Sequence, residues 1–171
     1  MVTSPWVNHH IDTVKMPNGE VCDDYHVVEL PTFVMVLATK GDKIMFVQPY
    51  RYLFGDVALE LPAGKIEDGE TAVQAGVREF FEETGCTLKN PKFIRTFRSS
   101  SGSTTQVAQI VFGEVGEEKS TNLDENEVAG KQLIPINEIS TLLNSITCGN
   151  TLVTLLLWQS MQSDNNAFSS Q

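Results

Sequence analysis

Three glutamates in the middle of the chain have the spacing of one helix face. Glu82 and Glu83 follow Glu79 by three and four positions, which brings the three carboxylates together within a single helical turn. Carboxylate oxygens are preferred ligands of Mg²⁺, which also binds water and phosphate oxygens. The alternative is a solvated acidic surface, because runs of charge usually face water. The spacing alone leaves both interpretations open.

The flanking residues predict a helix over Thr71–Thr84. Gly85 stands where a left-handed C-cap is wanted, and the residues that would cap the start or place a negative charge there are Asp68, Gly69 and Glu70. The wheel divides the helix into two faces. Ala72, Ala75 and Gly76 are predicted on the side of the glutamates, and the opposite, core-facing stripe comprises Val73, Val77, Phe80, Phe81 and Thr84.

Arg78 and Glu70 are predicted to support the glutamates. Arg78 precedes Glu82 by one turn, so its guanidinium can offset the repulsion among the carboxylates. Glu70 lies at the helix start and is expected to orient the loop 63–69, with direct metal contact as the alternative.

The complete pattern closely resembles the signature box of the Nudix hydrolases. Every charged and glycine position of that box is filled, and only Cys86 departs from the aliphatic residue usual in the family. Seven fixed positions make the match far more specific than a lone glycine-rich fingerprint. The metal site is therefore favoured over the plain acidic surface. The pattern reads Gly64, five residues, Glu70, seven residues, Arg78-Glu79-Phe80, one residue, Glu82-Glu83, one residue and Gly85.

Three further segments are similar to landmarks of the ADP-ribose pyrophosphatase branch of this family, and the similarity extends over about Met16 to Trp158. It implies an α/β/α sandwich with a mixed sheet and a Mg²⁺ cofactor, with Mn²⁺ as an alternative. It also implies hydrolysis of a nucleoside diphosphate sugar, with ADP-ribose giving AMP and ribose 5-phosphate. The segments are Gln48-Pro49-Tyr50-Arg51, Leu59-Glu60-Leu61-Pro62-Ala63-Gly64 and Asp124-Glu125-Asn126-Glu127.

The resemblance also implies a metal site. The backbone carbonyl of Ala63 and the carboxylates of Glu79 and Glu83 would hold the metal, with Glu82 as a further ligand that takes part in catalysis. Residues expected to support the site are Gly64, Glu70, Arg78 and Gly85.

Catalytic and substrate-binding residues are implied in the same way. Glu125 and Glu127 would lie on a loop over the substrate, where we favour Glu125 as the general base. Glu127 is the alternative base and a further metal ligand, and a solvated acid is the rival interpretation for both. Arg51, Glu60 and Gly102 would bind substrate, with a surface arginine as the alternative for Arg51.

One segment departs from the branch. Where its members commonly carry a Ser-Pro-Gly turn followed by an acid, this chain has Ser100–Gln106 with neither the proline nor the acid. Serine and glycine still favour a turn, so contacts to the distal sugar are expected to differ.

Composition limits the classes of partner and the cellular compartments expected for the protein. The chain has 171 residues and a formal charge of −10, which argues against a nucleic-acid-binding surface. Its three cysteines have no Cys-x-x-Cys spacing and predict reduced thiols in a cytoplasmic protein. The sequence shows no secretory pattern and no apolar run of membrane-spanning length, so no membrane association is expected.

The expected organisation is an N-terminal strand region at 1–30, a Nudix domain at 31–162 and a disordered tail at 163–171. The Asn18-Gly19 hairpin signal places two strands in the first region, which by the resemblance would build a homodimer. Pro91 is expected to break the chain after the helix. Predicted strands are Ile11–Met16, His26–Leu30, Thr32–Thr39, Lys43–Val47, Val57–Leu61, Lys92–Arg98, Gln106–Val115 and Val128–Ile134, and predicted helices are Asn137–Ser145 and Asn150–Met161.

Two other function classes stay open. A Nudix-like module could sense a nucleotide sugar without hydrolysing it, although such modules tend to lose carboxylates of the box. An enzyme of the same family could instead act on another diphosphate, such as GDP-mannose, a flavin dinucleotide or an oxidised nucleoside triphosphate.

Overall fold

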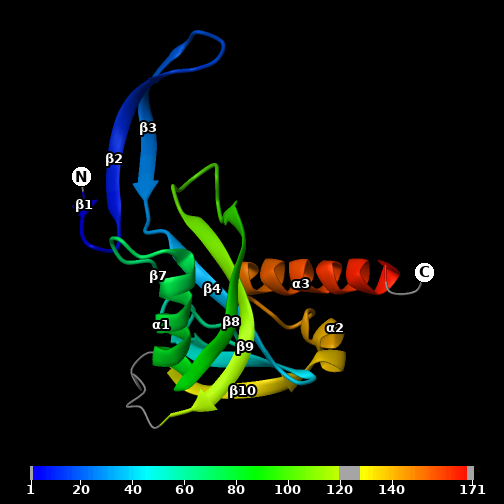
Figure 1. Cartoon of the computed structure of the whole chain (residues 1–171). Coiled ribbons are helices and arrows are strands. Elements are labelled where there is room, and N and C mark those ends of the chain that lie inside the picture. The colour runs from blue at the N-terminus through cyan, green and yellow to red at the C-terminus, as the bar shows by residue number, and fades with distance from the viewer. Residues whose placement is uncertain (1, 120–127, 169–171) are drawn as a thin grey trace.

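The computed structural model describes residues 2–119 and 128–168 and contains two separate sheets (Figure 1). The smaller sheet is N-terminal and antiparallel, in the order β1-β2-β3. Gly19 forms its predicted turn with φ 91° and donates a hydrogen bond to the carbonyl of Met16. The two strands predicted on either side of this turn pair with each other. Its strands are β1 Val2–Thr3, β2 Asn8–Lys15 and β3 Val21–Glu29.

The larger sheet has seven strands in the order β10-β5-β4-β9-β8, with β6 paired to β5 and β7 paired to β4. The pair β4–β9 is parallel and the other pairs are antiparallel, so the sheet is mixed, as predicted. The strands are β4 Phe33–Lys40, β5 Lys43–Arg51, β6 Asp56–Val57, β7 Ala63–Lys65, β8 Cys86–Arg98, β9 Val107–Glu118 and β10 Val128–Pro135.

Helices cover both faces of this sheet and give the expected α/β/α sandwich (Figure 1). Alternate residues of β4 enter two different cores, as the pleat requires. Val34 and Val36 pack with the helix α1, whereas Met35 and Leu37 pack with the C-terminal helices. The helical elements are α1 Ala72–Thr84, the 3₁₀ turn η1 Ile136–Glu138, α2 Ile139–Leu142 and α3 Gly149–Phe168. None of the helices described is long and apolar enough to cross a bilayer.

The buried face of α1 corrects the predicted wheel. Phe80 and Thr84 are buried as expected, but so are Ala72, Ala75 and Gly76, while Val77 is 38% exposed. The small residues let the helix lie close to the sheet, since a Cβ on Gly76 would stand 3.3 Å from a methyl of Val36. The glutamates therefore border the core instead of lying opposite it.

Several element boundaries also differ from prediction. Pro91 does not end the strand, because β8 continues through a register shift next to Asn90, whose φ is 50°, and a bulge tolerates a proline. The segment Val57–Leu61 is mostly extended loop, with Glu60 forming only an isolated bridge to Val47. The helix predicted at Asn137–Ser145 is η1 followed by one turn of α2, and α3 continues past Met161 to Phe168.

Candidate active site

Both ends of α1 are capped, which fixes where its glutamates lie. The N-cap is Thr71, not the predicted residues before it, because its hydroxyl accepts from the N–H of Gln74 while the Gln74 amide oxygen accepts from the N–H of Thr71. Gly85 closes the other end in the left-handed conformation, φ 67°, and donates to the carbonyl of Phe81, as predicted.

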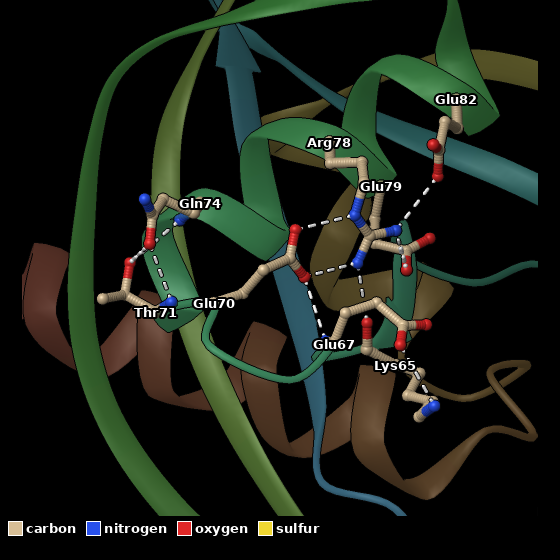
Figure 2. A network of polar contacts seen from close by, with 8 residues as sticks. All are labelled: Lys65, Glu67, Glu70, Thr71, Gln74, Arg78, Glu79 and Glu82. Atoms are coloured by element: carbon tan, nitrogen blue, oxygen red, sulfur yellow. Dashed lines mark hydrogen bonds and ion pairs between the residues drawn. The ribbon is translucent and has the colours of Figure 1, made fainter. Parts of the chain in front are cut away.

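Arg78 holds three carboxylates with one guanidinium (Figure 2). Its Nε and Nη2 donate to the two oxygens of Glu70 at 2.9 and 2.7 Å. Its Nη1 donates to Glu79 at 2.6 Å and to Glu82 at 3.1 Å. Nη2 also donates to the carbonyl of Lys65 at 2.9 Å. Arg78 thus joins the start of α1, two of its acids and β7 in one network.

Glu70 is ionised over the whole ordinary pH range. The hydrogen bonds from Arg78, and next the backbone N–H of Glu67 at 3.0 Å, lower the pKa of Glu70 to about 2. The hydrogen bond to Glu70 is in turn the main reason that the pKa of Arg78 is raised. Glu70 therefore forms an ion pair with Arg78 and holds the loop before the helix through the N–H of Glu67.

The remaining face of the site is the backbone of β7. The N–H of Ala63 donates to Glu83 Oε2 at 3.0 Å. Gly64 lies directly under Glu79, because a Cβ on this glycine would fall 2.0 Å from the carboxyl carbon of Glu79. Only glycine leaves room for that carboxylate. Adjacent residues of β7 thus meet two glutamates that lie one helical turn apart.

A cavity of about 460 Å³ opens beside β7, with Ala63 and Gly64 in its wall. Arg51 and Glu60 also line it and form a bidentate pair, Nε to Oε1 at 2.8 Å and Nη2 to Oε2 at 2.6 Å. The Glu60 side chain is 8% exposed and that of Arg51 47%. The hydrogen bonds to Glu60 raise the pKa of Arg51. Glu60 therefore acts on Arg51, whose Nη1 makes no hydrogen bond to the described residues.

Other predicted site residues lie elsewhere. Gly102 lines a different, smaller cavity of about 160 Å³ between the turn Ser101–Thr105 and β3. There Thr105 donates its N–H to the carbonyl of Val28. Glu125 and Glu127 lie outside the described residues.

The residues present suit a hard divalent cation in chemistry. Within the described ranges, no three His, Cys, Asp or Glu side chains are grouped so that they could hold a metal ion together. Glu79 and Glu82 nevertheless contact the same Arg78 nitrogen, and Glu83 reaches the backbone next to Gly64. Carboxylate and carbonyl oxygens with open positions are the donor set of Mg²⁺, which keeps waters and phosphate oxygens. The oxygen donors of the α1 glutamates and of Ala63 therefore fit a divalent cation of this kind.

Sequence reasoning missed Trp6, Cys148 and Lys131. Trp6 and Cys148 line the large cavity from opposite ends of the chain, and no local pattern indicates that they meet. Lys131 contacts the end of α1 from β10. The absence of any basic residue in the last turn of α1 is the one signal that could have prompted a search for an external cation.

Comparison with known proteins agrees with this geometry. An ADP-ribose pyrophosphatase from Bacillus subtilis is 32% identical over 143 residues, covering 81% of this chain and 76% of the relative. A methanol dehydrogenase activator from Bacillus methanolicus is 32% identical over 124 residues, covering 71% and 66%. A crystal structure of an ADP compounds hydrolase has the same fold, with a TM-score of 0.77 at 17% identity, covering 96% and 98% of the two chains.

The match to a family is direct. Residues 29–148 match the model of the NUDIX domain, a span that contains α1, β7, Arg51 and Glu60. Nudix hydrolases generally use divalent metal ions, which agrees with the donor set on α1. The chain belongs to the Nudix family and is a pyrophosphohydrolase.

Proposed function

We propose that this enzyme hydrolyses the diphosphate linkage of a nucleoside diphosphate sugar with Mg²⁺, and that ADP-ribose gives AMP and ribose 5-phosphate. One observation carries the proposal. The acidic face of α1 meets β7 at Ala63 and Gly64, and the same two residues line the 460 Å³ cavity. A substrate in this cavity would place its phosphates beside the carboxylates.

The substrate class rests on the cavity and on the relatives. Arg51 faces the cavity with a guanidinium whose orientation Glu60 fixes, and a planar fork of donors suits phosphate or sugar hydroxyls. The Bacillus subtilis relative is an ADP-ribose pyrophosphatase, which favours ADP-ribose among the nucleotide sugars. Gly102 is proposed as a further contact, although it lines the smaller cavity.

In the proposed reaction, water attacks one phosphorus, a new P–O bond forms, and the bond to the bridging oxygen breaks with its electron pair leaving on the other phosphate. Bound divalent ions supply charge neutralisation on the phosphates and lower the pKa of water. Glu79, Glu82, Glu83, the Ala63 carbonyl and Glu127 are the proposed ligands.

The general base is proposed to be Glu125, with Glu127 as the alternative, because a carboxylate within hydrogen-bond reach can accept the proton of the attacking water. Arg78 and Glu70 hold Glu79 and Glu82 in place through the network in Figure 2. Gly64 leaves the room that the Glu79 carboxylate occupies.

A substrate panel tests the proposal. The protein is incubated with ADP-ribose, GDP-mannose, a flavin dinucleotide and an oxidised nucleoside triphosphate, with Mg²⁺, Mn²⁺ or EDTA, and the products are separated by chromatography. We expect the highest kcat/KM for ADP-ribose, equal amounts of AMP and ribose 5-phosphate, and no turnover in EDTA. A different preferred substrate would refute the ADP-ribose assignment, and binding without turnover would instead indicate a nucleotide-sugar sensor.

We also propose that two copies associate through the N-terminal sheet. Its strands pair only with one another within the described chain, and a small sheet needs further packing to be stable. Trp6 is 69% exposed, Ile11 54% and Val21 67%, and exposed apolar side chains of this size suit a partner. Sedimentation at micromolar concentration should give a dimer, and a monomer would contradict the proposal. Cytoplasmic location stays a prediction, as does the absence of a nucleic-acid partner.

A further inference from the structure

The glutamates of α1 lie at the electrostatically unfavourable end of their helix. Glu82 and Glu83 occupy the last turn, where the helix dipole is negative and favours cations over acids. The helix has no basic residue of its own in that turn. Arg78 contacts Glu79 and Glu82, and Glu83 accepts from Ala63. A further cation at the helix end would therefore stabilise it.

Lys131 supplies that cation from another element of the fold. Its Nζ donates to the carbonyl of Thr84, the residue after Glu83, and lies 4.0 Å from Cys86 Sγ. The Thr84 carbonyl is one of the last four of the helix, which have no acceptor role within it. The Lys131 side chain is 26% exposed, so this contact is shielded from water on most sides.

The strand around Lys131 is shaped for this contact. The pairing of β10 with β5 shifts register between Val128 and Lys131, and bulges of this kind re-aim side chains. Gly130 lies within the shifted stretch, and a Cβ there would come 2.8 Å from Gln48 Oε1. The same Nζ also donates to Glu118 of β9 at 2.7 Å. Lys131 thus joins β9, β10 and the end of α1.

We propose that Lys131 is a positioning residue for the metal-binding carboxylates. It holds the C-terminal turn of α1 at a fixed place relative to β10, so that Glu83 is already in place when the cation binds. The proposal rests on the proposed metal site at Glu79, Glu82 and Glu83. The proposal predicts that removal of Lys131 weakens cation binding. A lysine that acted only through its charge would repel the cation, so its removal would strengthen cation binding.

A direct measurement of metal binding distinguishes a positioning role of Lys131 from a purely electrostatic one. Mn²⁺ binding to the full chain is followed by electron paramagnetic resonance, without substrate, for the parent, Lys131→Met and the charge-matched control Lys92→Met, which removes an exposed lysine of β8. Outer-shell partners of metal ligands typically contribute 10–100-fold in affinity. We expect Lys131→Met to bind Mn²⁺ at least about tenfold more weakly, with the control unchanged. Equal or tighter binding by Lys131→Met would overturn the proposal.

Two further variants complete the design. Glu83→Gln in the parent background should lose Mn²⁺ binding; if it does not, the proposed metal site itself is wrong, which is a separate failure from that of Lys131. Thermal unfolding in EDTA shows whether each variant is folded at the assay temperature. If Lys131→Met does not fold, Lys131→Ala, which also lacks a donor, takes its place with the same two decisive outcomes. Glu118→Gln leaves the contact to Thr84 intact and should bind Mn²⁺ within about twofold of the parent if the helix end is what matters.

Discussion

Glu83 accepts a hydrogen bond from the backbone N–H of Ala63 at 3.0 Å, although the two residues are 20 positions apart. The contact joins the last turn of α1 to the strand that lines the large cavity. A carboxylate in this place can bind a cation while its other oxygen stays fixed to the backbone. The acidic face of α1 is thereby joined to the cavity wall through Ala63.

Glu83→Gln should nearly abolish turnover while leaving the fold intact. The substitution removes the ligand charge without changing shape, and a direct ligand should cost more than the roughly 100-fold limit seen for outer-shell partners. Steady-state kinetics at saturating Mg²⁺ measure the effect, and circular dichroism checks the fold. A near-normal kcat would show that Glu83 is not a ligand.

Gly64→Ala should displace the Glu79 carboxylate. The added methyl would lie 2.0 Å from the Glu79 carboxyl carbon, so the side chain must leave its place and metal affinity should fall. The matched control is Gly149→Ala, where a Cβ meets nothing within 4 Å. Titration of Mn²⁺ against both variants provides the measurement, and equal affinities would contradict the packing argument.

Glu60→Gln should raise KM more than it lowers kcat. The amide can accept one of the two Arg51 hydrogen bonds but adds a donor that cannot pair with a guanidinium, so Arg51 loses its fixed direction toward the cavity. An imperfectly paired buried group costs about 1–3 kcal/mol, and the half-exposed Arg51 favours the lower end. Denaturant unfolding and steady-state kinetics measure the two effects. A selective loss of kcat would instead place Glu60 in the chemical step.

The Glu70–Arg78 pair should make the free energy of unfolding depend on pH in the acidic range. Because the pKa of Glu70 is lowered from 4.5 to about 2, its contribution is fully present above pH 4.5 and is lost as the pH falls toward 2. The stability difference between the parent and Glu70→Gln should therefore be constant above about pH 5 and shrink below it. Urea unfolding from pH 6 to pH 2.5 follows the difference. A gap that stays constant down to pH 2.5 would mean that the pair is not coupled to folding.

Glu125→Gln should lower kcat by roughly 10²–10⁴-fold, the usual contribution of general base catalysis, with little change in substrate affinity. Glu127→Gln provides the comparison in the same assay. A loss in Glu127→Gln with none in Glu125→Gln would transfer the role of base to Glu127.

The sequence predicted the elements that carry local signals. The box around Glu79 has a helical period and a closing glycine, so the helix and its C-cap at Gly85 follow from neighbouring residues alone, whereas the N-cap was predicted before Thr71. The wheel failed at Gly76 because periodicity ranks valine as more buried than glycine, whereas close approach to the sheet requires the smaller residue. Val77 is the opposite case, because the wheel predicts that it is buried and it is exposed in the structure.

Contacts between distant segments were beyond the sequence. Trp6, Arg51 and Cys148 meet at one cavity only because the sheet and α3 bring them together. The Arg51–Glu60 pair illustrates the intermediate case. Each residue was predicted to bind substrate, but their pairing depends on how the chain from β5 returns beside Val47.

Gly76 sets the depth at which α1 rests on the sheet, because a Cβ there would stand 3.3 Å from Val36 and 3.4 Å from Val34. A larger side chain there would lift the helix away from Val34, Val36 and Val111 and carry every acid with it. Replacements at this buried glycine should therefore alter catalysis without touching any reacting atom. Differences in metal preference between related chains should be sought at such packing positions as well as at the metal-binding glutamates.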